Sequence, residues 1–234
     1  MATIFIALQD VQARIAAACT AAGRSPSEVR LLAVSKTFPA DDIRTLYQTG
    51  VRAFGENYAQ ELADKDQSLT DCQDIEWHFI GPLQSNKTRL VAECAAWVHT
   101  IDRLKIAERL AKQRPAHLPA LNICLQVNVS GETSKSGVAP SELSELAIAI
   151  RSLPQLKIRG LMCIPEATHD TQKLAQQFLL LKQLLAQLNE QGFALDTLSM
   201  GMSSDLELAI KSGSTMVRVG SAIFGARQAH QEPK

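Results

Sequence analysis

The sequence predicts an α/β fold, a single-domain (β/α)8 barrel of the TIM type with an extra N-terminal helix. Eight short apolar segments alternate with helical segments, which is typical of parallel strands joined by helices. They recur at a mean spacing of roughly 29 residues, and the chain of 234 residues is close to the barrel length of about 250. An open doubly wound sheet would show the same alternation, so the count of eight favours the barrel. No linker divides the chain, so we expect one domain over 1–234 with 227–234 as a frayed polar tail.

The first half of the chain begins with a helix whose apolar residues, from Leu8 to Ala22, fall on one face. Gly23 is expected to end this helix. The first strand follows at 31–36, where an apolar run without polar alternation indicates a strand covered on both faces. The remaining elements of this half are expected in this order: a helix at 41–50, a strand at 53–56, a helix after Asn57, a strand at 76–82, a helix capped by Asn86, a strand at 98–102 and a helix at 103–113.

The second half continues the same alternation. A fifth strand at 122–129 ends in a polar loop at 130–137. The elements expected after this loop are a helix at 141–152, a strand at 157–164, a helix at 170–190, a strand at 197–202, a helix ending at Gly213 and a strand at 216–220.

Composition narrows the class of protein. The 24 basic residues balance the 24 acidic ones, so nothing indicates nucleic acid or an anionic membrane as a partner. The five cysteines are far apart and form no C-x-x-C pair, which favours a reducing compartment over a disulfide framework. The apolar N-terminal run stops at Gln9, too short for a signal peptide or a membrane span. We therefore expect a cytoplasmic protein, a monomer, with no nucleic-acid or membrane partner.

Lys36 is the first candidate for chemistry. The two-residue period of a strand places Leu32, Val34 and Lys36 on one face, which brings an amine to the rim of an apolar core. Desolvation disfavours the charged form of such an amine and makes it available for attack on a carbonyl group. The alternative is a lysine that extends from the strand end into water.

The C-terminal ends of barrel strands meet on one face, where active sites lie. The loops after the seventh and eighth strands, at 201–205 and 218–222, are the usual phosphate site of such barrels. Their small residues let the backbone approach a phosphate, and their hydroxyl and N–H groups can bind it. The residues expected at the eight strand ends are Lys36, Glu56 with Asn57, Pro82, Asp102, Asn128, Ile164, Ser203 and Gly220.

Arg218 lies within the eighth strand and is expected to point inward with Met216 and Gly220. A buried arginine needs a partner, and Glu56 or Asp102 would be a purely structural one. The other possibility is a ligand that carries both a phosphate and an aldehyde, namely pyridoxal 5′-phosphate (PLP). Lys36 would form its Schiff base and Arg218 would meet its ring nitrogen. A permanently charged arginine there disfavours protonation of that nitrogen, so the ring would be a poor electron sink.

Other candidates carry weaker signals. His78 is expected to be a hydrogen-bonded core or rim histidine, and the remaining histidines have no metal-ligand spacing, so no metal site is predicted. Lys135 could be a second amine near the rim, although a solvated loop lysine is favoured. No nucleophile elbow, Walker A run or dinucleotide fingerprint occurs.

Seven stretches that follow one another along the chain form a recognisable set: Ala33-Val34-Ser35-Lys36, Phe54-Gly55-Glu56-Asn57, His78-Phe79-Ile80-Gly81-Pro82, Ser134-Lys135-Ser136-Gly137, Arg159-Gly160-Leu161-Met162, Ser199-Met200-Gly201-Met202-Ser203 and Val217-Arg218-Val219-Gly220-Ser221. Together they resemble the pyridoxal phosphate homeostasis protein family. The resemblance covers nearly the whole chain in order. It implies a barrel like the N-terminal domain of alanine racemase, with PLP on Lys36 and Arg218 facing the pyridine nitrogen. One departure is Ser204-Asp205, where relatives often carry two acidic residues. The resemblance also implies that Ser203, Gly220 and Ser221 hold the phosphate and that Asn57 and Met200 lie near the ring.

These expectations lead to a non-catalytic PLP-binding protein that acts in intracellular PLP (vitamin B6) homeostasis, with PLP-dependent apo-enzymes as candidate recipients and no catalytic residues. A PLP-dependent amino acid racemase is the first alternative. Two-base racemisation needs proton donors on both faces of the substrate, whereas both tyrosines, Tyr47 and Tyr58, fall in expected helices. A Schiff-base aldolase acting on a sugar phosphate through Lys36 is the second alternative.

Overall fold

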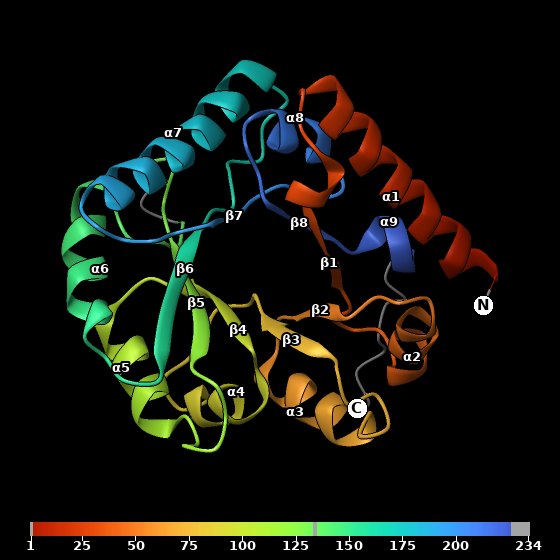
Figure 1. Cartoon of the computed structure of the whole chain (residues 1–234), viewed down its shortest axis with the longest axis horizontal. Helices are drawn as coiled ribbons and strands as arrows, with labels where there is room; N and C mark the ends of the chain where they lie inside the picture. The colour runs from red at the N-terminus through yellow and green to blue at the C-terminus, as the bar shows by residue number, and fades with distance from the viewer. Residues whose placement is uncertain (1, 133–134, 226–234) are drawn as a thin grey trace, which may run out of the picture.

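Eight parallel strands close into a barrel in the computed structural model, which describes residues 2–132 and 135–225 (Figure 1). Each strand pairs with the next, and β8 pairs with β1 to complete the ring. The predicted fold class is therefore confirmed. The strands are β1 (Arg30–Val34), β2 (Ala53–Glu56), β3 (Glu76–Phe79), β4 (Trp97–Ile101), β5 (Leu121–Gln126), β6 (Leu156–Met162), β7 (Thr197–Ser199) and β8 (Met216–Val219).

Helices surround the strands on the outside of the barrel (Figure 1). Two short 3-10 turns, η1 (Pro26–Glu28) and η2 (Pro140–Glu142), precede β1 and α6. The helices are α1 (Ala2–Ala21), α2 (Ala40–Gln48), α3 (Ala59–Ser68), α4 (Thr88–Cys94), α5 (Leu104–Gln113), α6 (Leu143–Arg151), α7 (Thr171–Glu190), α8 (Leu206–Lys211) and α9 (Ser221–Phe224).

The strands separate two packed regions, one between the strands and the helices and one inside the barrel. Alternate residues of each strand face opposite sides, so Val217 and Val219 of β8 join the large core between strands and helices. Met216, the residue before Val217, faces the opposite side and packs inside the barrel with Leu32 and Ala53. Because both faces of each strand are covered, the strands read as continuous apolar runs.

Helix α1 lies across α8 and α9, next to the seam where β8 meets β1 (Figure 1). Leu8, Val11 and Ile15 are buried on its inner face, and Arg14 forms an ion pair with Glu207 of α8 at 2.8 Å. The stretch from Thr3 to Ala21 is long and apolar enough, by length and composition alone, to cross a membrane. The expected end of the apolar run at Gln9 was therefore too early, although the core helix of a globular protein passes the same test.

Some predicted boundaries differ from the structure. Strand β1 ends at Val34 rather than at residue 36, because Thr37 takes a positive φ of 68° that turns the chain out of the sheet. Asn86 is not a helix cap: α4 begins at Thr88, and its N-cap residue is Lys87, which makes no capping bond through its side chain. The predicted frayed tail at 227–234 lies outside the described residues.

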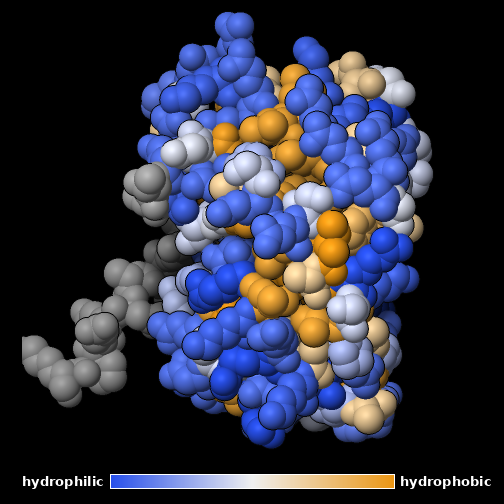
Figure 2. All heavy atoms as spheres, turned by 90° about the vertical axis from the view of Figure 1, so that its left-hand side faces the viewer, coloured by the Kyte–Doolittle hydropathy of each residue, from blue (hydrophilic) through white to orange (hydrophobic). Residues whose placement is uncertain are grey.

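The face that carries α6 and α7 shows a band of apolar atoms between polar ones (Figure 2). Two large apolar residues of these helices are exposed, Ile148 of α6 and Leu179 of α7. Single exposed apolar side chains are common on protein surfaces, and we assign no function to them.

Candidate functional site

A cavity of about 350 Å³ opens at the rim where the strands end. Strands β1 and β8 and the loops after β2, β6 and β7 contribute to its wall. Six of the seven residues predicted to bind the cofactor line it: Lys36, Asn57, Ser203, Arg218, Gly220 and Ser221. These residues are far apart in the sequence, and closure of the barrel brings them together.

Lys36 lies two residues beyond β1, in a turn that is held from below. The N–H of Ser35 donates to the carbonyl of Gly55 at 3.0 Å, which continues the pairing of β1 with β2 past the strand end. The N–H of Thr37 donates to Oε1 of Glu61 at 2.6 Å. The backbone on both sides of Lys36 is therefore fixed by neighbouring elements.

A buried ion pair lies beneath this turn. Lys65 of α3 donates from Nζ to the Ser35 carbonyl at 2.8 Å, to Oε1 of Glu56 at 2.7 Å and to Oε1 of Glu61 at 2.8 Å. Ser35 Oγ also donates to Oε1 of Glu56 at 2.6 Å. Burial raises the pKa of Glu56 to about 7 although Lys65 and Ser35 oppose the shift. Glu56 thus faces α3 and not the cavity, because the inward position at the end of β2 belongs to Gly55.

The loops after β7 and β8 meet at one end of the cavity. The hydroxyl oxygens of Ser203 and Ser221 are 3.4 Å apart. A Cβ atom on Gly220 would lie 3.1 Å from the carbonyl oxygen of Val34, so glycine allows β8 to approach β1 closely here. The N–H groups in the first turn of a helix have no acceptor within the helix, and α9 begins at Ser221. This end therefore presents hydroxyl and N–H donors of the kind that bind phosphate.

Arg218 extends into the barrel interior and is only 5% exposed. Its Nη1 donates to the carbonyl oxygen of Ser199 at 2.6 Å and to Ser199 Oγ at 2.9 Å, and its Nη2 donates to the carbonyl of Cys163 at 2.9 Å. The structural partners considered from the sequence, Glu56 and Asp102, are therefore wrong. Within the described part of the chain, no carboxylate forms an ion pair with this guanidinium. Burial lowers the pKa of Arg218 from its ordinary value.

A row of hydrogen-bonded polar side chains continues from Arg218 through the interior of the barrel. Ser199 Oγ lies 2.8 Å from Nδ1 of His99, whose Nε2 lies 2.9 Å from Nδ1 of His78. Nε2 of His78 lies 2.8 Å from Oε1 of Glu76. Both histidines are fully buried, so the expectation of a hydrogen-bonded core position for His78 is confirmed. The other members of this row were not predicted from the sequence. The signal that could have indicated them is a polar residue at alternate positions of a strand, which places it on the inward face.

The pKa values of the titratable groups in this row are shifted by burial and by their neighbours. Burial alone would raise the pKa of Glu76, but hydrogen bonds from His78 and from Arg30 outweigh it and lower the pKa to about 2. Burial lowers the pKa of His78, although Glu76 opposes the shift. Burial also lowers the pKa of His99 well below its ordinary value, and the charge of Arg218 adds to this. Burial thus disfavours the charged form of both imidazoles, whereas the hydrogen bonds to Glu76 favour its carboxylate form.

Other predicted strand-end residues lie away from the main cavity. Asp102 lines a separate cavity beside α5 and α6. Asn128 binds its own loop, donating from Nδ2 to the Glu132 carbonyl at 2.8 Å. Pro82 and Lys135 line a third cavity that shares Asn57 and other wall residues with the main one. Among the described residues no group of acidic, histidine and cysteine side chains could hold a metal ion.

Met200 is the one predicted cofactor-binding residue that the structure places elsewhere. It is fully buried in the core between the barrel and its helices. Alternation along β7 explains this, because Ser199 faces inward to Arg218 and the next residue must face outward. Met202, two residues further on, lines the cavity instead.

The donor set of the cavity fits PLP. Its wall carries a primary amine for an aldehyde, a pair of hydroxyls for a phosphate and a guanidinium for a ring nitrogen. Oδ1 of Asn57 is buried at the same wall without a hydrogen-bond partner, which leaves it available to a ligand. The volume lies within the range of small-molecule sites.

A closed parallel barrel with these groups at its C-terminal rim defines a protein of the alanine racemase barrel class. The family model described as alanine racemase, N-terminal domain, matches residues 6–228. The pyridoxal phosphate homeostasis protein of Pseudomonas aeruginosa is 57% identical over 97% of this chain and 97% of its own length. That of Escherichia coli K12 is 53% identical over 94% of this chain and 95% of its own. The chain belongs to the pyridoxal phosphate homeostasis protein family, within the alanine racemase N-terminal domain family, as the resemblance predicted.

Solved structures agree with this assignment. PipY of Synechococcus elongatus, solved with PLP bound, has a TM-score of 0.81 and 37% identity, covering 92% of this chain and 100% of PipY. Alanine racemase of Corynebacterium glutamicum has a TM-score of 0.70 and 17% identity, covering 96% of this chain and 64% of the racemase. The second likeness shows the fold alone.

Proposed function

We propose that this chain binds PLP in the rim cavity and acts in intracellular PLP homeostasis without catalytic turnover. The observation that carries the proposal is the meeting of Lys36, the hydroxyls of Ser203 and Ser221, and Arg218 around one cavity. Each matches a different group of the cofactor. The PLP found in PipY supports the proposal.

In this proposal Lys36 holds the aldehyde carbon as a Schiff base, and the fixed turn around it limits where the amine can reach. Ser203, Ser221 and the backbone near Gly220 bind the phosphate. Arg218 donates to the ring nitrogen, and Asn57 lies beside the ring. The cofactor supplies an electrophilic carbon and a conjugated ring when bound.

Two features of the cavity support a role without turnover. Arg218 is a permanent cation, which disfavours a proton on the ring nitrogen and so weakens the ring as an electron sink. Among the described residues of the cavity wall, Lys36 is the one that carries an amine. Racemisation needs a proton donor on each face of a substrate, so a single amine does not meet this need. We therefore propose storage or handover of PLP, with PLP-dependent apo-enzymes as recipients.

The remaining parts of the proposal concern the state of the protein in the cell. All five cysteines are free thiols, four of them buried, which supports a reducing compartment such as the cytoplasm. We propose a monomer without nucleic-acid or membrane partners, in line with the balanced charge of the chain.

The proposal is tested by trapping with borohydride. Purified protein is reduced and digested, and mass spectrometry should locate one phosphopyridoxyl group on Lys36. The Lys36→Ala variant should lose both this adduct and the absorption band of the Schiff base. Lys105→Ala, which removes an exposed lysine of α5, is the matched control and should keep both. An unchanged band in Lys36→Ala would refute the assignment, and trapping only with added sugar phosphate would favour the aldolase.

Absence of turnover is tested separately with PLP-loaded protein. We expect no interconversion of L- and D-alanine above the rate of free PLP, measured by chiral chromatography. An alanine racemase at equal concentration is the positive control. Interconversion at ordinary enzyme rates that is lost in Lys36→Ala would contradict the proposal.

A further inference from the structure

The row of hydrogen-bonded polar side chains inside the barrel connects the cofactor cavity with the opposite end of the barrel. We call the side chains of Ser199, His99, His78 and Glu76 the interior chain. Ser199 touches Arg218 in the cavity wall, whereas Glu76 is the first residue of β3. The chain therefore runs from the C-terminal rim of the barrel to the N-terminal ends of its strands.

When both imidazoles are neutral, the hydrogen bonds of the interior chain run in one direction only. A guanidinium has no acceptor, so Ser199 Oγ accepts from Arg218. An ionised carboxylate has no donor, so Nε2 of His78 carries a hydrogen and donates to Glu76. A neutral imidazole has one donor and one acceptor, so Nδ1 of His78 accepts from Nε2 of His99. By the same rule Nδ1 of His99 accepts from the Ser199 hydroxyl.

This direction has a consequence for Arg218. The hydroxyl hydrogen of Ser199 is committed to His99, so its lone pairs are free to accept from Nη1 of Arg218 at 2.9 Å. With the carbonyls of Ser199 and Cys163, this makes three acceptors around the guanidinium. The position of the Arg218 guanidinium therefore depends on the direction of the hydrogen bonds in the interior chain.

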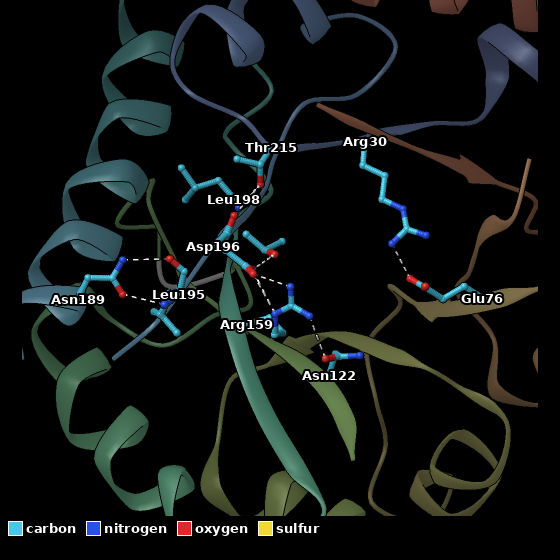
Figure 3. A network of polar contacts seen from close by, with 10 residues as sticks. Arg30, Glu76, Asn122, Arg159, Asn189, Leu195, Asp196, Leu198 and Thr215 are labelled. Carbon is cyan, nitrogen blue, oxygen red and sulfur yellow. Dashed lines mark hydrogen bonds and ion pairs between the residues drawn. The ribbon is translucent and has the colours of Figure 1, made fainter. Parts of the chain in front are cut away.

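The far end of the chain is anchored by a charge. Arg30 donates from Nη1 to Oε1 of Glu76 at 2.7 Å, which balances the carboxylate (Figure 3). His78 is also stacked on Trp97, with ring centroids 5.4 Å apart and planes at 9°. The rings can thus move little, and a change at Glu76 is passed along the chain as a change of hydrogen position.

We propose that the interior chain positions Arg218 at the cofactor site, with Glu76 as the residue that sets its direction. The part that concerns the cofactor rests on the proposed function, whereas the direction of the chain does not. Glu76, His78 and His99 are positioning residues, because within the described structure they act on the cavity through Ser199.

Glu76→Gln is the variant that probes the direction of the chain. The amide has nearly the same shape as the carboxylate but carries a donor as well as an acceptor. It can therefore donate to Nε2 of His78, which reverses every hydrogen bond up to Ser199. The Ser199 oxygen would then accept from His99 as well as from Arg218, and its hydroxyl hydrogen would no longer be directed to His99.

The first test uses protein without cofactor and reads the ring hydrogens by ¹⁵N NMR of the histidine side chains. In the wild type, both His78 and His99 should be neutral and protonated on Nε2. In Glu76→Gln, a measurable share should carry the hydrogen on Nδ1. Asp196→Asn is the matched control, because Asp196 pairs with Arg159 at the same end of the barrel without joining the chain (Figure 3). A wild type with either ring protonated on Nδ1 would overturn the proposed direction.

The second test measures the equilibrium dissociation constant of PLP and the absorption maximum of the bound cofactor. Glu76→Gln should weaken binding roughly three- to tenfold, as expected for coupled polar residues, and shift the maximum. Asp196→Asn should change neither quantity. Equal behaviour of the two variants would refute the positioning role. If the wild type bound no PLP, the proposed function would fail, while the NMR result would still decide the direction.

A second set of variants covers the case in which Glu76→Gln folds poorly. Ser199→Ala removes the link between the chain and Arg218, and Ser199→Thr restores the hydroxyl. The alanine variant should shift the absorption maximum and the threonine variant should return it toward the wild-type value. Ser214→Ala removes another fully buried hydroxyl, which donates to backbone carbonyls of the same strands, and should leave the maximum unchanged. Equal shifts in both alanine variants would overturn the proposal.

Discussion

Glu56 illustrates how a single residue near the site can serve the scaffold and not the chemistry. Its sequence position at the end of β2 suggests a cavity residue, yet it pairs with Lys65 under the turn that carries Lys36. Loss of one partner of a buried pair is strongly destabilising, by about 3–5 kcal/mol, because it leaves the other charge uncompensated. The pair therefore ties the stability of the barrel wall to the placement of the reactive amine.

The raised pKa of Glu56 predicts a pH dependence of stability. The pKa is about 7 in the folded protein against 4.5 as the ordinary value. Between these values the folded state binds more protons than the unfolded state. The contribution of this group to the free energy of unfolding is therefore fully present below 4.5 and is lost as the pH rises through about 7.

Urea denaturation of the wild type and of Glu56→Gln at several pH values checks this prediction. Glutamine does not titrate, so the wild type should lose stability relative to the variant as the pH rises from 5 to 8. A constant difference between the two proteins over this range would contradict the raised pKa. Each comparison is made at one pH, so other titrating groups cancel to first order.

Short strands with ordered turns at their ends are the main feature at the scale of elements. β7 has three residues and β8 four, shorter than the apolar patterns suggest, because the residues that follow serve the rim. Gly160 of β6 allows an unusually close approach to β7: a Cβ there would lie 1.8 Å from the carbonyl oxygen of Thr197. This contact holds β7 where Ser199 can reach Arg218.

Helix starts show where local signals suffice. The predicted start of the long helix near Asp170 is confirmed, since its carboxylate accepts from the N–H groups of Gln172 and Lys173 at the start of α7. The same kind of signal at Asn86 failed, because the chain continues as a turn up to Lys87 before α4 begins. A capping residue fixes a helix start only where the following turn leaves its side chain near the first N–H groups.

At the scale of the whole molecule, the two tryptophans report on opposite sides of the barrel wall. Trp77 packs in the outer core and donates to Asp66 of α3. Trp97 packs inside the barrel with Cys124 and Met162. One closed sheet carries both, so neither side can lose its packing while the other stays intact.

We therefore predict a single cooperative unfolding transition, as expected of one domain. Trp77→Phe leaves Trp97 as the fluorescent reporter, and Trp97→Phe leaves Trp77. Within each variant, fluorescence and far-ultraviolet circular dichroism should give the same urea midpoint. A fluorescence midpoint separated from the circular dichroism midpoint in either variant would indicate two cooperative units.

The sequence alone determined the number and order of the strands, the rim position of Lys36 and the two loops that meet at Ser203 and Ser221. These features follow from local periodicity together with the rule that strand ends of a barrel share one face. Tertiary structure decided which side chains pair inside. Arg218 binds Ser199 and Cys163 rather than a carboxylate, and His99 meets Ser199 across 100 residues of chain. Such pairs depend on the register and closure of the barrel, because these bring together residues that no local sequence pattern links.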